Sequence, residues 1–441
     1  MSATAAPRRR RADPVSPARP AVPRREILAF RGAVAVILLA VADDAFLHPE
    51  AGTGPADHLA GGLVPLAIGL ALMLAYPRLR AGIRAGAALV CGTLAVVAGA
   101  VDGFRHVAVD RLAGDDVTAV LAGLAGALLI GLAVAVLWRT RRLDEAPARR
   151  YGRRLATGVA CLFAVFLVLL PAAIAIVATH KARSPVAAVD LGGPYERVTL
   201  KTYDGLKLAA WYVPSRNGAA VIAFPGRSQP VPHARMLVRH GYGVLLLDRR
   251  GEGESEGDYN AFGWGGEADV AAAVGFLRGR PDVDPDRIGG LGLSVGGELL
   301  LQAAAHTRAL RAVVSEGAGV RSLAEHRHTP GVGRVQRWFS EWVVQTGALA
   351  VLSGVAPPED LTRLVARVSP RALMLIEAQH GAGGEELNGV YLAAAGDPKS
   401  LWRAQGRHTR ALATQPAEYE RRVVGFFDRA LPGDGVRTAR R

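Results

Sequence analysis

A serine between glycines is the strongest candidate for chemistry in this chain. The sequence GLSVG (292–296), followed by Gly297, has the spacing Gly-x-Ser-x-Gly. An apolar run over 287–294 leads into the serine, and a helix-like stretch over 296–305 follows it. A sharp turn from strand to helix exposes a serine hydroxyl, and only small neighbours leave room for that turn. The motif therefore predicts that Ser294 is a nucleophile for acyl transfer.

The context of the motif carries more weight than the motif itself. In a chain with 52 glycines, a bare Gly-x-Ser-x-Gly arises by chance. From about residue 185, however, apolar runs alternate with helix-like stretches, as in a parallel sheet built from βαβ units. A hairpin is predicted around Asp204-Gly205 within 196–214. The expected strands then lie at 219–226, 242–248, 287–294, 310–317, 371–378 and 400–405, and the expected helices include 264–279, 296–305 and 416–430.

The stretch from Asp204 to Gly317 resembles the α/β-hydrolase superfamily, near its serine aminopeptidase and monoacylglycerol-lipase-like members. The sequence HARMLVRHGYGVLLLDRRGEGESEG (233–257) matches their helix, strand and D-x-R-G-x-G-x-S loop. The likeness continues to about Leu431 and is specific for the fold but weak for the substrate. It implies an α/β domain over 185–435 with a mainly parallel sheet, acting as a serine hydrolase on carboxylic esters.

The resemblance also assigns roles by position. The oxyanion hole would use the backbone N–H groups of Val295, after the nucleophile, and Arg227, after the third strand. The family often has His-Gly in that second loop, whereas this chain has Pro225-Gly226, which keeps the backbone donor. His408, after the last expected strand, fits the general base. The competing histidines are His240, His306, His326, His328 and His380.

The acidic member of the triad departs from the family pattern. The family usually places an aspartate after the strand that corresponds to 371–378, but this chain reads QHGAGGEELN (379–388) there. Glu385 and Glu386 are the available carboxylates, and we favour Glu386 slightly. Both could instead cap a helix that begins near Glu385, where acidic residues suit the helix dipole. Asp248 matches the expected acid of the triad only by its residue type. Its place after the fourth strand favours a structural role.

The first 180 residues contain segments long and apolar enough to cross a bilayer as helices. Four segments are clear: 59–76, 85–101, 117–138 and 155–179. A fifth segment, 27–47, is weaker because it contains Arg31, Asp43 and Asp44. We predict a basic tail over 1–26 and a transmembrane region of about five helices over 27–180. We interpret this region as an anchor, with ligand or partner binding as the alternative.

Charges in the loops predict the orientation of these helices. Arginines are frequent before residue 26 and in loops 77–84 and 139–154, and sparse in loops 48–58 and 102–116. The positive-inside rule therefore puts the N-terminus in the cytoplasm and the hydrolase domain on the outer face of the cell membrane. The formal net charge of +14 follows from this distribution, so we do not expect nucleic acid as a partner.

An insertion over roughly 320–365 is expected to form a small helical cap. Val335, Trp338, Phe339, Trp342 and Val343 fall at helical spacing. This stripe could line an acyl pocket, touch the bilayer, or simply pack in a core.

Three functions remain open from the sequence. The first is a membrane-anchored hydrolase of lipid-like or other acyl esters, a small-molecule substrate class. The second is a peptidase or amidase with the same triad, and the third is an inactive membrane scaffold, which the missing aspartate would explain. No metal or organic cofactor is expected, and the two cysteines, Cys91 and Cys161, lie in apolar runs without metal-ligand spacing.

Overall fold

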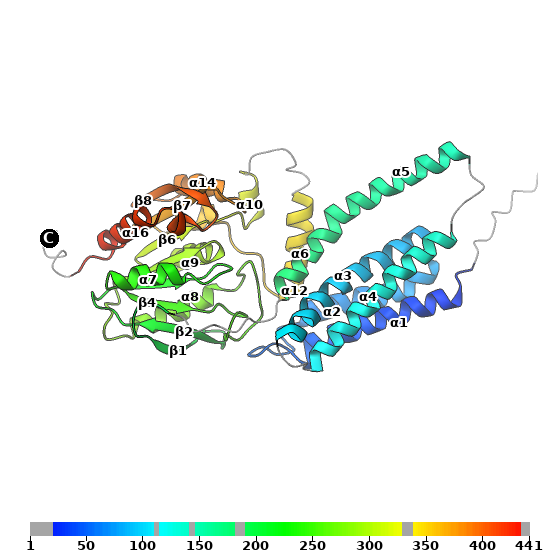
Figure 1. Ribbon diagram of the computed structural model, residues 1–441, viewed down its shortest axis with the longest axis horizontal. Helices are drawn as coiled ribbons and strands as arrows, with labels where there is room; N and C mark the ends of the chain where they lie inside the picture. The colour runs from blue at the N-terminus through cyan, green and yellow to red at the C-terminus, as the bar shows by residue number, and fades with distance from the viewer. Residues whose placement is uncertain (1–20, 110–113, 141–145, 181–189, 329–337, 434–441) are drawn as a thin grey trace, which may run out of the picture.

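The computed structural model describes residues 21–109, 114–140, 146–180, 190–328 and 338–433. Two bodies lie end to end along the long axis of the molecule: a bundle of long helices and a sheet covered by shorter helices (Figure 1). The first body comes from the apolar N-terminal part of the chain, and the second from the part in which strands and helices alternate.

An eight-stranded sheet forms the centre of the second body. Its order is β1-β2-β4-β3-β5-β6-β7-β8, with β1, β2 and β4 paired antiparallel and every other neighbouring pair parallel. The predicted α/β class with a mainly parallel sheet is therefore confirmed. The strands are β1 Glu196–Lys201, β2 Lys207–Val213, β3 Ala220–Phe224, β4 Gly243–Leu247, β5 Ile288–Leu293, β6 Ala312–Glu316, β7 Ala372–His380 and β8 Lys399–Arg407.

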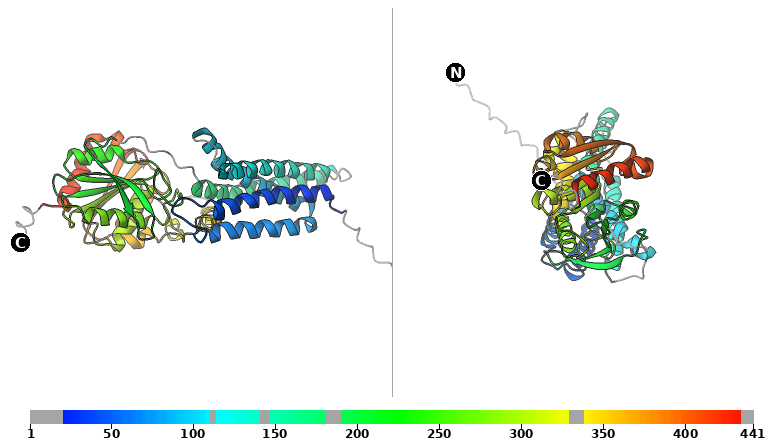
Figure 2. Two further views of the ribbon diagram at one scale, coloured as in Figure 1. Left: turned by 90° about the horizontal axis from the view of Figure 1, so that it is seen from below. Right: turned by 90° about the vertical axis from the view of Figure 1, so that its left-hand side faces the viewer.

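Helices cover both faces of this sheet, as Figure 2 shows, and each face has its own apolar core. One core joins the sheet to α7 Val231–Arg239, α15 Ala411–Thr414 and α16 Pro416–Ala430. The other joins it to α8 Glu267–Arg278, α9 Val295–His306, α13 Leu361–Val365, η5 Glu385–Leu387 and α14 Asn388–Ala394. Strands buried on both faces need continuous apolar runs, which explains why β3 and β4 lack polar alternation.

The first body contains the predicted spans. Four of its helices are long and apolar enough to cross a membrane: Leu59–Arg78, Ala81–Val101, Val117–Arg139 and Pro147–Thr179. They coincide with the four clear segments of the sequence. The elements are α1 Arg24–Ala42, η1 Asp43–Leu47, α2 Leu59–Ala75, η2 Tyr76–Arg78, α3 Ala81–Val109, α4 Gly114–Arg139, α5 Pro147–Ala164, η3 Val165–Leu169 and α6 Leu170–Thr179.

The weaker segment 27–47 is not among those four, because Arg31, Asp43 and Asp44 interrupt its apolar character. It is nevertheless helical and lies in the bundle. The Arg31 Nε donates to the carbonyl of Met73 at 3.0 Å, and Asp43 accepts from the Thr118 hydroxyl at 2.7 Å. Arg31 and Asp43 are thus paired within the bundle, whereas Asp44 is exposed and lies 3.8 Å from His180.

Glycines allow α3 and α4 to approach closely. A Cβ on Gly92 would come within 2.6 Å of the Gly126 carbonyl oxygen, and one on Gly99 within 2.6 Å of the Ala119 oxygen. Small residues at such positions let the backbones of two helices pack closely.

The two bodies are joined by more than the connecting chain. The Ala261 N–H donates to the Ala178 carbonyl at 2.9 Å, and the Gly257 N–H donates to the Ala51 carbonyl at 2.8 Å. Three further elements follow β6: α10 Leu323–His326, η4 Trp338–Gln345 and α12 Thr346–Ser353. Leu349 of α12 packs with Ala175 of α6 and Trp264 in a shared apolar cluster. Residue Val335 of the predicted stripe lies outside the described residues.

Candidate active site

Ser294 lies at the sharp turn between β5 and α9. Its backbone has φ 52° and ψ −126°, a conformation that side chains rarely adopt. The glycines around it permit the turn: a Cβ on Gly292 would meet the Gly296 carbonyl carbon at 2.5 Å, and one on Gly296 would meet the Pro225 oxygen at 2.5 Å. The strained turn thereby projects the hydroxyl beyond the carboxyl end of β5.

His408 lies in the turn after β8 and reaches the serine. The two atoms, His408 Nε2 and Ser294 Oγ, are 3.0 Å apart. Thr409, the next residue, has a positive φ of 54°, which turns the chain sharply after the histidine. The distance suits transfer of the hydroxyl proton to the imidazole.

The other ring nitrogen of His408 contacts a carboxylate of Glu385. This side chain is buried, and its second oxygen accepts the Ala378 N–H at 2.9 Å. The slight preference for Glu386 thus finds no support in the geometry: Glu386 lines the adjacent cavity, while Glu385 points back over β7. Consecutive residues of the short helix η5 face different directions, and only the first reaches the imidazole.

Val295 and Arg227, whose N–H groups the resemblance implies for the oxyanion hole, line the same cavity as Ser294. Within the described part of the chain, no hydrogen bond is recorded for the N–H groups of Val295 and Arg227. Gly226 brings the second loop close, since a Cβ there would lie 2.6 Å from the Leu293 oxygen and 3.3 Å from the Ser294 Cβ. Free amides at this position are what an oxyanion hole requires.

Buried polar side chains hold the loops that carry these groups. Glu316, at the end of β6, accepts the Ala411 N–H at 3.1 Å and so fixes the turn that bears His408. Asn388 donates to the Ala318 carbonyl at 2.9 Å, which holds the Glu385 helix against the loop after β6. Glu316 was not singled out from the sequence. It could have been found from its position, because it lies at the carboxyl end of a parallel strand. Functional sites of parallel sheets usually lie at this end of the strands.

The competing residues lie elsewhere or have other partners. His240 contacts Glu420 at 2.7 Å and His306 contacts Glu267 at 2.6 Å, both on outer helices. His328 and His380 are exposed, and His326 is buried beside the Trp342 ring. Asp248 accepts from the Gln229 amide at 2.5 Å, and burial raises its pKa to about 6. Its other oxygen accepts the Glu254 N–H at 3.2 Å, so the side chain holds the loop after β4.

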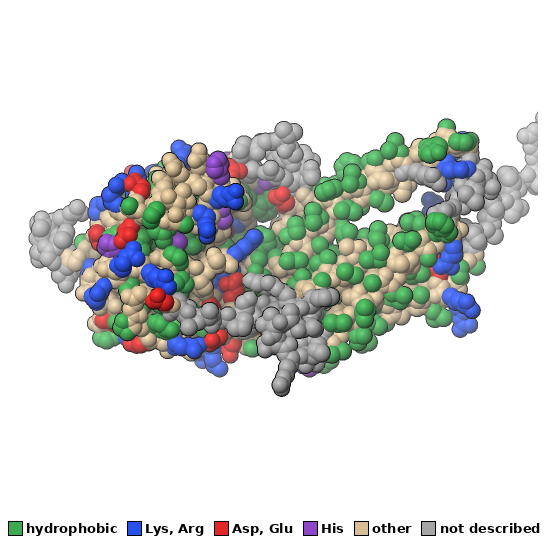
Figure 3. All heavy atoms as spheres, in the orientation of Figure 1, with side chains coloured by type: hydrophobic (Ala, Val, Ile, Leu, Met, Phe, Trp, Pro, Cys, Tyr) green, Lys and Arg blue, Asp and Glu red, His purple; other side chains and the backbone are tan. Residues whose placement is uncertain are grey.

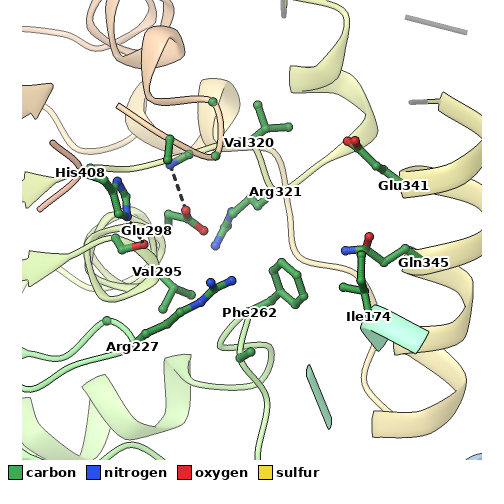
Figure 4. A pocket seen from close by; sticks show the side chains of 18 of the residues that line it. Ile174, Arg227, Phe262, Val295, Glu298, Val320, Arg321, Glu341, Gln345 and His408 are labelled. Carbon is green, nitrogen blue, oxygen red and sulfur yellow. Dashed lines mark hydrogen bonds between the residues drawn. The ribbon is translucent and has the colours of Figure 1, made fainter. Parts of the chain in front are cut away.

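A cavity of about 770 Å³ opens in front of Ser294. Figure 4 shows Arg227, Glu298 and Arg321 beside the catalytic end of this cavity, with Glu341, Gln345 and Ile174 on its far side. The Glu298 carboxylate accepts the Gly319 N–H at 3.0 Å. Neither Glu298 nor Arg321 was singled out from the sequence. Among the described residues, no group of three or more His, Cys, Asp or Glu side chains is arranged to hold a metal ion.

Comparison with known proteins agrees with this architecture. The family model of the X-Pro dipeptidyl-peptidase (S15 family) matches residues 172–417, more than half of the chain. The chain is 25% identical over 252 residues to the uncharacterized protein YfhR of Salmonella typhi, covering 54% of this chain and 82% of that protein. It is 34% identical over 134 residues to the thiohydrolase aneE of Aspergillus aculeatus, covering 27% and 41%. The Pyrococcus furiosus esterase Pf2001 aligns with TM-score 0.44 and 20% identity, covering 56% of this chain and 100% of that structure.

The sheet, its covering helices and the serine turn define an α/β-hydrolase, which confirms the superfamily indicated by the sequence. Within that superfamily, the chain belongs to the X-Pro dipeptidyl-peptidase (S15) family. The protein is a hydrolase of the α/β type with an N-terminal region of membrane-spanning character.

Proposed function

We propose that this protein is a membrane-anchored serine hydrolase that cleaves carboxylic esters of lipid-like or other acyl substrates through an acyl-enzyme. One observation carries the proposal: Ser294 Oγ, on a strained turn, lies 3.0 Å from His408 Nε2, whose other nitrogen contacts the buried Glu385 carboxylate. A hydroxyl, a base and an orienting acid in this order form the triad of nucleophilic acyl transfer.

In the proposed reaction, His408 Nε2 takes the Ser294 proton as Oγ attacks the carbonyl carbon. The oxygen that gains negative charge is stabilised by the N–H groups of Val295 and Arg227. The C–O bond to the leaving alcohol breaks, and that alcohol takes the proton from His408. Water, deprotonated by the same imidazole, then cleaves the acyl–serine bond, releasing the acid and restoring Ser294. Glu385 stabilises the imidazolium throughout.

A peptidase or amidase is the second candidate function. The match to the X-Pro dipeptidyl-peptidase family favours it, because the same triad cleaves amides. Parallel assays on p-nitrophenyl acyl esters and on dipeptidyl p-nitroanilides with proline in second place would separate the two. The ester proposal predicts a higher kcat/KM on the acyl esters, and the reverse order would support the peptidase.

The nucleophile can be tested directly. A fluorophosphonate probe should label the wild-type protein and fail to label the Ser294→Ala variant. Labelling that persists in the variant would refute the assignment. A wild-type protein that neither takes the probe nor turns over any ester would favour the scaffold function.

We also propose that the N-terminus is cytoplasmic and the hydrolase domain extracytoplasmic, from the distribution of arginines. In support, loop 48–58, which has no Lys or Arg, lies at the sheet end of the bundle, where Ala51 accepts from Gly257. The arginine-rich start of α5 lies at the opposite end (Figure 1). A membrane-impermeant serine probe applied to intact cells should label Ser294. Labelling only after lysis would contradict this orientation.

A further inference from the structure

We propose that the substrate is a membrane-resident long-chain acyl ester, and that its acyl chain reaches Ser294 sideways from the bilayer, between the last transmembrane helix and η4. The inference rests on the proposed function and adds to it the substrate class and the route of access. It depends on three features of the cavity: which elements form its walls, what the outer side of those walls faces, and how polarity is distributed along it.

The first feature is that the cavity belongs to both bodies of the molecule. Ser294 and His408 lie at one end. The other end is lined by Phe166, Leu170 and Ile174, which belong to the continuous helix Pro147–Thr179. Beside them lie Trp342 and Gln345 of η4 and Leu349 of α12. A helix apolar enough to cross a membrane thus forms one wall of the site at which a serine is activated.

The second feature is that the same wall faces outward. Phe166, Leu170 and Ile174 are 50%, 46% and 40% exposed, although they line the cavity. Towards its N-terminus, α5 diverges from α3 and α4 (Figure 1), and Figure 3 shows a notch bordered by apolar side chains between them. The exposed apolar side chains of this helix therefore include those that line the cavity.

The third feature is a change of polarity along the cavity. Charged side chains of both signs surround the catalytic end, namely Arg227, Glu298 and Arg321. The end towards α6 has an apolar side, formed by Phe166, Leu170, Pro171 and Ile174, and a more polar side, where η4 contributes Glu341 and Gln345. An amphiphile with its ester at Ser294 would place its polar head among the charges and its acyl chain along the helix. Its chain would then lie against the apolar side chains of the helix.

This route has a kinetic consequence that a soluble substrate would not show. A chain that moves from water into an apolar site gains about fourfold in binding for each methylene. A chain that moves from lipid into the same site gains almost nothing, because its surroundings are already apolar. We therefore expect the rate on vesicle-embedded esters to follow their mole fraction in the membrane, and to change less than about twofold per methylene at constant mole fraction.

The test uses the full-length protein reconstituted in phosphatidylcholine vesicles that contain a fluorogenic long-chain acyl ester. Diluting the ester with phosphatidylcholine at constant bulk concentration should lower the rate in proportion to the mole fraction. A rate that depends only on bulk concentration would overturn the inference.

A variant pair tests the route. Leu170→Trp places a larger side chain at the cavity wall, whereas Leu162→Trp places it on the same helix at another exposed leucine, which does not line the cavity. Leu170→Trp should slow hydrolysis of the vesicle ester at least tenfold and that of p-nitrophenyl acetate less than twofold, while Leu162→Trp changes neither. Equal effects of the two variants, or no effect of either, would overturn the route.

Fluorophosphonate labelling and turnover of p-nitrophenyl acetate keep the two proposals distinguishable. A protein that turns over the acetate but shows no dependence on mole fraction retains the proposed function and refutes membrane access. A protein that neither takes the probe nor hydrolyses the acetate refutes the proposed function itself.

Discussion

Replacing the Glu385 carboxylate by an amide tests the triad most sharply. In the structure, one carboxylate oxygen contacts His408 Nδ1 and the other accepts the Ala378 N–H. The Glu385→Gln side chain has a single oxygen, and the Ala378 N–H requires it. The amide NH₂ then faces His408 Nδ1, which must accept a hydrogen bond from it. The ring proton therefore moves to Nε2, and the imidazole can no longer take the proton of Ser294.

The size of this effect follows from the change of tautomer and the loss of the charge that stabilises the imidazolium. In a serine protease triad, the corresponding substitution lowers kcat by about 10⁴. We expect Glu385→Gln to lower kcat by about 10³–10⁴, equivalent to about 4–5.5 kcal/mol in the activation free energy. KM should change little, because the carboxylate is buried behind the imidazole and does not line the cavity.

The adjacent glutamate is the matched control. Glu386 lines the cavity and has the same side chain, so Glu386→Gln should leave kcat within about threefold of wild type. Both variants can be assayed for steady-state turnover of a p-nitrophenyl ester, with far-UV circular dichroism to verify folding. Wild-type kcat in Glu385→Gln, together with a large loss in Glu386→Gln, would refute the arrangement described here.

Three further predictions follow from buried contacts. Gly226→Ala places a Cβ 2.6 Å from the Leu293 oxygen, so the oxyanion loop must move and kcat/KM for an ester should fall about 10²–10³-fold without loss of folding. Arg250→Met leaves the fully buried Asp269 without its partner at 2.8 Å; thermal unfolding in detergent should show a loss of about 3–5 kcal/mol, partly recovered when Asp269→Asn is added. Burial raises the pKa of Glu325 from 4.5 to about 7, so its contribution to stability is complete below about pH 4.5 and is lost as the pH rises through 7. The melting temperature should therefore fall between about pH 4.5 and 7 and level off above, and Glu325→Gln should flatten that fall; an unchanged pH profile in the variant would contradict the shift.

Local signals were sufficient to predict the strands, the four apolar helices and the turn at Ser294. Each depends on a pattern within one segment: a continuous apolar run, a helix-length apolar stretch, or glycines at fixed offsets around a serine. The position of His408 could be predicted because it follows the last strand, and parallel strands carry their site residues beyond their carboxyl ends.

The acid could not be assigned from the sequence, because two consecutive glutamates differ only in the direction that the backbone gives them. Gly384 has φ 93° and begins the short helix η5, and this conformation decides that Glu385 turns towards Ala378 and His408. The shared cavity was likewise beyond prediction. It requires contact between η4 and the apolar helix Pro147–Thr179, and six of the eight strands, β1 to β6, lie between these two elements in the sequence.

The wall contributed by Phe166, Leu170 and Ile174 has a practical consequence for biochemistry on this protein. A soluble fragment that begins after residue 180 would keep Ser294, His408 and Glu385, and a probe for reactive serines could still report it as competent. Its binding site, however, would be a groove with one side missing. Substrate selectivity measured on such a fragment would describe only the part of the site formed by the hydrolase domain. Long-chain compounds would bind this fragment more weakly than they bind the intact protein.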